Sequence, residues 1–131
     1  MTENLSEKTK QIVDGRAFAV LGTLNADGSP HTSVIWVARD GDALVFTTHD
    51  QRRKAHNLRR DPRAALTVFD PQDPYESVDV RGRVELIDDP DRRLSFDLTR
   101  RYLGEDPPAD PAGSRRLIGR MTAEHVGGTA A

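Results

Sequence analysis

Cysteine is absent from the 131-residue sequence, so the protein has no disulfide framework, no thiolate metal site and no cysteine nucleophile. Long hydrophobic runs are missing too, and no stretch approaches the roughly 18 apolar residues that a membrane span requires. The first residues include Glu3 and Glu7 where a signal peptide would have its apolar segment. These absences predict a cytoplasmic protein that does not enter a membrane.

An excess of one charge and a large aromatic content are also lacking. The formal net charge is −2, so no overall field favours nucleic acid or an acidic membrane surface. Aromatic residues make up 5% of the chain, whereas single-stranded RNA binding needs a basic surface with stacking aromatics. An RNA-binding module that uses the arginines of segment 52–60 is therefore only a minor alternative.

Standard catalytic and metal-binding motifs are missing as well. The sequence contains no dinucleotide-binding or Walker glycine loop, and its serines show no nucleophile elbow. The histidines have neither metalloprotease nor zinc-finger spacing; they are His31, His49, His56 and His125. We therefore predict no metal site and assign no catalytic residue. If the protein is an enzyme, a cofactor should carry the chemistry.

Turn signals divide the chain into short strands within one domain, residues 1–131. Segment 77–86 shows the clearest period of two, with valines on one face and charged residues on the other. Six strands are expected, at 17–24, 31–38, 43–48, 63–69, 77–86 and 115–122. The pattern predicts a mainly β fold with flanking helices, in which an antiparallel barrel occupies residues 16–126.

Three helices are expected around this barrel. The first lies within residues 1–15, with Ser6 as its N-cap and Gly15 as its end. The others lie near 50–60 and 90–103, and the last should have Pro90 at its first helical position and end at Gly104. Residues 105–113 contain three prolines and should form an irregular surface loop, as should the residues around Pro71 and Pro74.

The helix near 50–60 begins with an unusual charge pattern. Asp50 is a suitable N-cap, which places Arg52, Arg53 and Lys54 in the first turn. Cations are unfavourable there because the helix dipole is positive at that end. An anion bound to the free N–H groups would offset the repulsion, and a phosphate is the obvious candidate. The alternative is a solvated basic face.

The hydroxyl pair Thr47-Thr48 lies directly before this helix and favours a bound phosphorylated ligand. The order of these residues with their neighbours resembles the flavin-phosphate segment of the pyridoxamine 5'-phosphate oxidase-like split β-barrel superfamily. The motifs that carry the resemblance are Thr47-Thr48, Arg53-Lys54-Ala55-His56 and Asp61-Pro62-Arg63.

A longer set of motifs resembles the actinobacterial branch of that superfamily, the deazaflavin (coenzyme F-420)-dependent reductases. The resemblance covers roughly residues 16–126. Its motifs are Thr23-Leu24-Asn25-x-Asp27-Gly28-Ser29-Pro30, Val34-x-Trp36-Val37, Arg52-x-Lys54-x-x-Asn57-Leu58-Arg59-Arg60-Asp61-Pro62-Arg63, Asp70-Pro71-x-x-Pro74-Tyr75 and Val80-Arg81-Gly82-Arg83-Val84.

The resemblance implies a six-stranded split β-barrel that forms a homodimer with two cofactor sites at the interface. Arg52, Arg53 and Lys54 would hold the cofactor phosphate, and Thr47 and Thr48 would line the ribityl chain and ring edge. The strand that runs along the ring would contribute Thr32, Ser33, Val34, Ile35, Trp36 and Val37. Further candidate site residues are Asn57, Tyr75 and Arg81.

Several of these residues have simpler explanations. Trp36 suits the core or a dimer interface as well as a ring-stacking wall, and Tyr75 suits a loop anchor. Asn57 would equally bond to local backbone, and Arg81 would usually be solvated. Thr32 stands where FMN oxidases often have an arginine, which weakens the FMN interpretation. His56 stands where the deazaflavin branch commonly has another residue, which leaves both cofactors open.

The leading hypothesis is a reductase that transfers hydride from reduced coenzyme F-420 to an unsaturated small organic substrate. The first alternative is an oxidase or flavoprotein of the same fold that binds FMN. A third hypothesis, from another class, is a non-enzymatic protein that binds or carries the cofactor.

Overall fold

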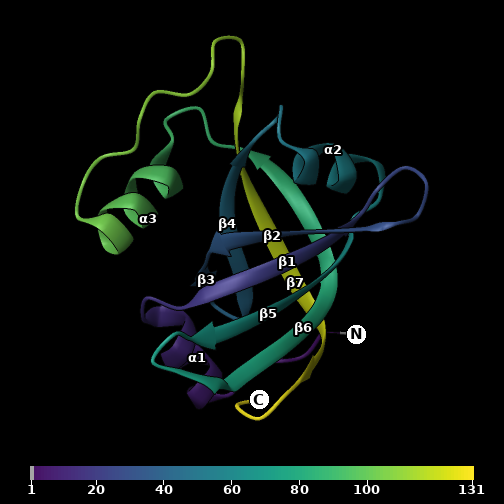
Figure 1. Cartoon of the computed structure of the whole chain (residues 1–131), viewed down its shortest axis with the longest axis vertical. Coiled ribbons are helices and arrows are strands. Elements are labelled where there is room, and N and C mark those ends of the chain that lie inside the picture. Colours follow the sequence, from purple (N-terminus) through teal and green to yellow (C-terminus); the bar gives the residue numbers. More distant parts are fainter. Residues whose placement is uncertain (1) are drawn as a thin grey trace.

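The structure is a computed structural model, and it describes residues 2–131. Three helices and seven strands follow one another in this part of the chain (Figure 1). The elements are α1 (Glu7–Asp14), β1 (Phe18–Leu24), β2 (Pro30–Trp36), β3 (Ala38–Asp40), β4 (Ala43–His49), α2 (Arg53–Arg60), β5 (Arg63–Asp70), β6 (Asp73–Asp88), α3 (Arg93–Leu103) and β7 (Arg116–Gly127). Among these residues, no helix is long and apolar enough to cross a membrane.

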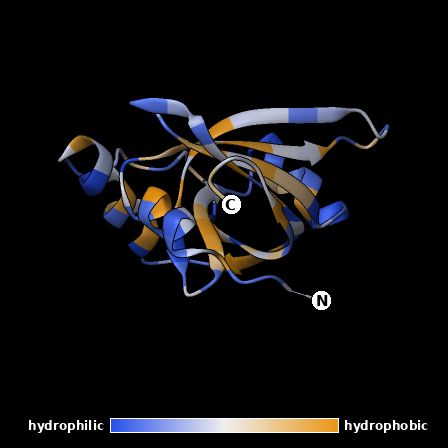
Figure 2. Cartoon of the chain, turned by 90° about the horizontal axis from the view of Figure 1, so that it is seen from below, coloured by the Kyte–Doolittle hydropathy of each residue, from blue (hydrophilic) through white to orange (hydrophobic). Residues whose placement is uncertain are grey.

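The seven strands form one antiparallel sheet in the order β2-β1-β5-β6-β7-β4-β3. The sheet curls around its interior, and the helices lie outside it (Figures 1 and 2). No ladder joins its two edges within residues 2–131, so the barrel is split. The predicted mainly β, split-barrel fold is confirmed.

The predicted strand count of six is wrong, because segment 31–38 forms two strands. Trp36, at the end of β2, pairs with Phe18 of β1, whereas Ala38 begins β3 and pairs with Val45 of β4. Between them, Val37 carries the chain from one edge of the sheet to the other. The run is continuous in sequence, but its partners lie at opposite ends of the strand order.

The core forms on the inner face of the sheet because apolar residues alternate along the strands. Along β6, Val78, Val80 and Val84 are buried between exposed charged residues, as predicted. The largest fully buried side chain is Phe46 of β4, which lies beneath Gly119 of β7. Figure 2 shows hydrophobic residues on the strands that surround the interior.

Helix α1 begins and ends where the sequence predicts. The hydroxyl of Ser6 accepts a hydrogen bond from the Thr9 N–H at 3.1 Å, and Gly15 is the C-cap. The hydroxyl of Thr9 in turn donates to the carbonyl of Ala130 at 3.0 Å. These contacts fasten α1 to the C-terminal end of the chain (Figure 1).

The predicted start of α3 at Pro90 is wrong. The helix begins at Arg93, because the carboxylate of Asp89 accepts hydrogen bonds from the N–H groups of Arg93 and Leu94 at 3.2 and 3.1 Å. Arg92 connects the two with a left-handed backbone, at φ 57°. The helix does end at Gly104, whose φ of 72° suits a glycine C-cap.

The region around the two early prolines also differs from the prediction. Pro71 lies in a tight turn, but Asp73 already begins β6, and Pro74 lies within that strand. The register of β5 against β6 shifts at Phe69 and Asp70, so Pro74 lies in an irregular part of the ladder. Proline has no N–H group to donate, and it is tolerated at such a place because the irregular ladder requires no hydrogen bond from it.

Candidate functional site

A groove of about 190 Å³ opens where β2 and β4 approach the start of α2. Its lining residues are Val34, Ile35, Trp36, Thr47 and Lys54. All five were predicted site residues, and the fold brings them together from three separate segments because the curled sheet packs β2 against β4. The ammonium of Lys54 lies 3.3 Å from the hydroxyl of Ser33, a sixth predicted residue.

The start of α2 is cationic, as the sequence predicts, but its cap differs. The N-cap is Arg52, which makes no side-chain capping bond, and the first turn contains no acidic residue. Asp50, the predicted cap, instead accepts a hydrogen bond from the Arg115 N–H at 2.9 Å. The N–H groups of Arg53 and Lys54 therefore open the helix without a capping side chain.

The environment of Lys54 makes its positive charge costly. Burial lowers the pKa of its ammonium, and the charge of Arg52 lowers it further. A bound anion would relieve both effects, since it would supply the opposite charge that the first turn of α2 lacks.

A buried histidine holds Arg52 beside the groove. His49 is 8% exposed, and its Nε2 accepts a hydrogen bond from the Nε–H of Arg52 at 3.2 Å. Burial lowers the pKa of this imidazole, and the charges of Arg52 and Arg116 lower it further. The ring is therefore neutral at physiological pH.

A second group of charged residues was not predicted. Arg116, at the start of β7, lies 3.4 Å from the Thr47 hydroxyl through its Nη1 atom. The carboxylate of Asp110, from the loop after α3, pairs with both Arg116 and Arg92. No sequence signal could have found this group, because it depends on how the proline-rich loop 105–115 folds back.

Trp36 also has a partner that the sequence did not reveal. Its ring stacks on Tyr102 of α3, with centroids 4.9 Å apart and an interplanar angle of 12°. The Tyr102 hydroxyl donates to the carbonyl oxygen of Ala17 at 2.5 Å and accepts from the Val37 N–H at 3.4 Å. Trp36 is thus both packed against α3 and part of the groove wall, so neither sequence interpretation excludes the other.

Three predicted site residues lie away from the groove because they are buried in the fold. Thr48 faces the opposite side of β4 from Thr47, as strand geometry requires, and its buried hydroxyl has no hydrogen-bond partner among residues 2–131. Val37 is fully buried in the core. Asn57 is also fully buried and donates to Thr23 Oγ1 and Asn25 Oδ1, both at 3.0 Å.

The remaining predicted site residues lie on outer surfaces. Thr32 and Arg81 line a separate groove of about 720 Å³ with His125, on the outer face of the sheet. Tyr75 is 87% exposed near the start of β6. None of these three residues lines the Lys54 groove within the described chain, so the groove of a single protomer does not contain the whole predicted set.

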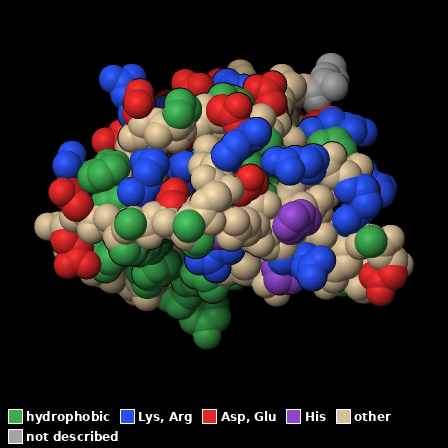
Figure 3. All heavy atoms as spheres, turned by 90° about the horizontal axis from the view of Figure 1, so that it is seen from above, with side chains coloured by type: hydrophobic (Ala, Val, Ile, Leu, Met, Phe, Trp, Pro, Cys, Tyr) green, Lys and Arg blue, Asp and Glu red, His purple; other side chains and the backbone are tan. Residues whose placement is uncertain are grey.

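The groove suits a phosphorylated aromatic ligand. Cations and free N–H groups lie at the start of α2, an aromatic wall is provided by Trp36, and hydroxyls of Ser33 and Thr47 lie between them. Figure 3 shows the same end of the molecule, where lysine and arginine side chains surround histidines beside a group of hydrophobic side chains.

Comparison with known protein families agrees with this geometry. The family described as pyridoxamine 5'-phosphate oxidase matches residues 5–130. The chain belongs to this family. The resemblance seen in the sequence is therefore confirmed at the level of the split-barrel superfamily.

Curated members of the family include pyridoxine/pyridoxamine 5'-phosphate oxidases from several bacteria. The enzyme of Pseudomonas entomophila is 35% identical over 81 residues, which are 61% of this chain and 37% of that protein. The enzyme of Myxococcus xanthus is 38% identical over 96 residues, or 70% of this chain and 45% of that protein. The chain thus spans less than half the length of these relatives.

Solved structures match the chain more completely. A structure described as an F-420 reductase superposes with a TM-score of 0.80 and 29% identity, covering 94% of this chain and 98% of its own. A conserved hypothetical protein from Mycobacterium tuberculosis has a TM-score of 0.73 and 27% identity, with 93% and 82% coverage. The family match, the curated oxidases and the F-420 reductase structure together support a flavin- or F-420-related oxidoreductase fold.

Proposed function

We propose that the protein is a reductase that transfers hydride from reduced coenzyme F-420 to an electron-poor, unsaturated small organic molecule. The observation that carries the proposal is the groove itself, in which Lys54, from the cationic and acid-free first turn of α2, lies beside Trp36. The full-length similarity to an F-420 reductase supports this choice of cofactor.

The residues around the groove divide the work of binding such a cofactor. Arg52, Arg53 and Lys54, together with the first N–H groups of α2, would bind the phosphate through charge-assisted hydrogen bonds. Thr47 would orient the sugar-like chain, and Trp36 would shield one side of the ring from water. When bound, the deazaflavin supplies a two-electron hydride carrier, and the protein contributes position and water exclusion.

The alternative is FMN, which would make the protein an oxidase or a flavoprotein. The specific observation in its favour is that the curated relatives are pyridoxine/pyridoxamine 5'-phosphate oxidases. Both cofactors present a phosphate to the same cations, so the groove alone does not separate them. A non-enzymatic cofactor carrier would also use these residues, but would release no product.

We further propose that the protein works as a homodimer with its cofactor sites at the interface. Val34, beside the groove, is 67% exposed, and the outer groove containing Thr32 and Arg81 is open. A second chain that covers these surfaces through a two-fold contact would bring the outer residues to the partner's site. This arrangement would explain why one protomer does not gather all the predicted residues.

Titration of the purified protein with coenzyme F-420 and with FMN, at matched concentrations, tests the proposal. Trp36 is the sole tryptophan and lines the groove, so ligand binding should quench its fluorescence, with calorimetry as the second readout. We expect tighter binding of F-420. If the purified protein is yellow and absorbs at roughly 450 nm, as bound flavin does, the FMN alternative is favoured. Binding of F-420 without oxidation of its reduced form by any activated alkene would favour the carrier.

A further inference from the structure

Arg116 is held so that one edge of its guanidinium faces the groove wall. Its Nε atom lies 3.1 Å from Asp110 Oδ2, and its Nη2 pairs closely with Asp110 Oδ1. This two-pronged contact occupies one edge of the planar group. The remaining Nη1 atom lies 3.4 Å from the hydroxyl of Thr47, which itself lines the groove.

The pair is well shielded from water. The side chains of Arg116 and Asp110 are 14% and 16% exposed. The hydrogen bond from Arg116 lowers the pKa of the Asp110 carboxyl, so this group is charged at neutral pH. Shielding strengthens each electrostatic contact, and a fixed guanidinium loses little conformational entropy when it binds a ligand.

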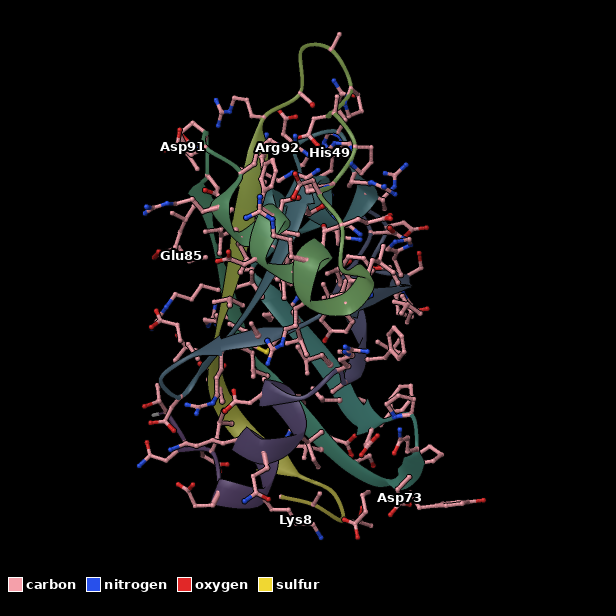
Figure 4. All side chains as sticks on the ribbon, turned by 90° about the vertical axis from the view of Figure 1, so that its left-hand side faces the viewer. Lys8, His49, Asp73, Glu85, Asp91 and Arg92 are labelled. Atoms are coloured by element: carbon pink, nitrogen blue, oxygen red, sulfur yellow. The ribbon has the colours of Figure 1, made fainter. Side chains whose placement is uncertain are left out.

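Two guanidiniums share the carboxylate of Asp110. Arg116 contacts both of its oxygens, and the Nε of Arg92 lies 3.3 Å from Asp110 Oδ2. The nearby carboxylates have other partners, since Asp88 pairs with Arg115 and Asp89 accepts from the first N–H groups of α3. His49 pairs with Arg116 across β4 and β7, and it is neutral and in contact with Arg52. In Figure 4 the labelled His49 and Arg92 lie at the same end of the molecule.

We propose that Arg116 is a further ligand-binding residue, whose Nη1 group has a second N–H beside the one that faces Thr47 and donates it to an anionic oxygen of a ligand seated against Thr47. The identification of that ligand as the cofactor rests on the proposed function. Asp110 is then a positioning residue, since it touches the guanidinium and aims it. The phosphate site would thereby extend from the first turn of α2 to the start of β7, with cations on both sides of the groove.

Two properties separate this role from a purely structural one. If Arg116 only fastened loop 105–115 to β7, its loss would lower stability and leave anion affinity unchanged. If it binds the ligand, its loss weakens binding and also reduces the dependence of affinity on salt, because one fewer charge pair is screened.

The matched variants are Arg116→Gln and Arg115→Gln. Arg115 is the preceding residue, but its side chain is 63% exposed and pairs with Asp88 on the surface. Inorganic pyrophosphate serves as an anion probe that does not depend on the identity of the cofactor, and coenzyme F-420 serves as the second ligand. Binding is measured by calorimetry at two salt concentrations, together with the thermal midpoint of each unliganded variant.

We expect Arg116→Gln to weaken binding of both ligands by about tenfold, as the loss of one charge-assisted hydrogen bond predicts, and to flatten the salt dependence. Arg115→Gln should bind within about twofold of the parent protein, as surface ion pairs contribute little. Arg116→Lys, which keeps the charge but not the fork, should give an intermediate affinity and serves if the glutamine variant does not fold.

Failure of this inference is distinguishable from failure of the proposed function. If Lys54→Ala weakens binding of F-420 and Arg116→Gln does not, the inference is wrong and the proposed function stands. If the parent protein binds pyrophosphate but neither cofactor, the proposed function is wrong, and a loss of pyrophosphate affinity in Arg116→Gln would still support the inference. The inference is overturned if the parent protein and Arg116→Gln bind pyrophosphate with equal affinity, or if the parent protein does not bind pyrophosphate.

Discussion

The ammonium of Lys54 lies 3.3 Å from the hydroxyl of Ser33, and this contact joins the first turn of α2 to the edge strand β2. The two residues are 21 positions apart in sequence. Their meeting places a half-buried cation directly beside the groove and defines where an anion would bind.

Replacement of Lys54 by alanine should weaken cofactor binding by about ten- to a hundredfold, because a charge-assisted hydrogen bond contributes about 1.5–3 kcal/mol. Arg53→Ala should act in the same direction. The thermal midpoint of the unliganded protein should not fall, since a cation in the first turn opposes the helix dipole. Fluorescence titration measures the affinity.

Lys8→Ala is the control, because Lys8 pairs with Glu76 elsewhere on the surface. Unchanged affinity in both groove variants would refute the phosphate assignment.

Replacement of Asn57 by alanine should destabilise the fold by about 2–4 kcal/mol, because two hydrogen bonds are lost and the buried Thr23 hydroxyl is left unpaired. Urea unfolding measures this change. The neighbouring His56 is exposed, so His56→Ala should have little effect. The folded fraction of Asn57→Ala should bind cofactor with the parent affinity, since Asn57 does not line the groove; a selective loss of affinity would restore it as a site residue.

The folded protein should become less stable as the pH decreases, and part of this loss should depend on His49. Its pKa in the folded protein lies below the ordinary value of 6.5, first because burial disfavours imidazolium and then because of Arg52. The unfolded chain therefore takes up this proton at higher pH than the folded chain. The contribution of the neutral His49 ring to the free energy of unfolding is therefore complete above about pH 6.5. It is lost as the pH falls below this value.

We accordingly expect His49→Gln to flatten the decrease of the thermal midpoint between about pH 7 and pH 5. His56→Gln, at an exposed position on α2, should leave the parent slope unchanged. Parallel curves for His49→Gln and the parent protein would show that the histidine does not control acid stability.

Gly119 should not tolerate a side chain. A Cβ atom there would lie 2.2 Å from the ring of Phe46, which is fully buried. Gly119→Ala should therefore destabilise the protein by about 1–3 kcal/mol, as overpacking does. At Gly22 the nearest atom would be at an ordinary 3.5 Å, so Gly22→Ala is the control. Equal urea midpoints for the two variants would contradict the packing of β4 against β7.

Light scattering at micromolar concentration should give twice the chain mass of 14.5 kDa. Val34 and Tyr75 are large apolar side chains with 67% and 87% of their surface exposed, and a second copy of the chain would bury such surface. A monomer mass in the presence of cofactor would rule out the proposed dimer and its shared sites.

Local features of this protein could be predicted from its sequence. The Ser6 cap and the Gly104 end depend on residues within one or two turns. The alternating faces of β6 follow from the period of its valines, because side chains of a strand point to opposite sides. The motifs around Lys54 and their order were sufficient to predict the superfamily. Part of the residue set that this resemblance implied lines one groove: Val34, Ile35, Trp36, Thr47 and Lys54.

Other features depend on contacts between distant segments. The break at Val37 arises because the curled sheet offers partners at both of its edges, which the apolar run 31–38 does not reveal. Asn57 is buried and bonded to Asn25 because the β1–β2 hairpin folds onto α2. The ring of Trp36 stacks on Tyr102 because α3 packs beside β2. Arg116 meets Asp110 only because a proline-rich loop turns back over the barrel. Local sequence thus determined the helices and strands and which of their faces are apolar. The tertiary structure decided which charged residues lie beside the groove, because ion pairs and burial depend on distances that only the folded chain defines.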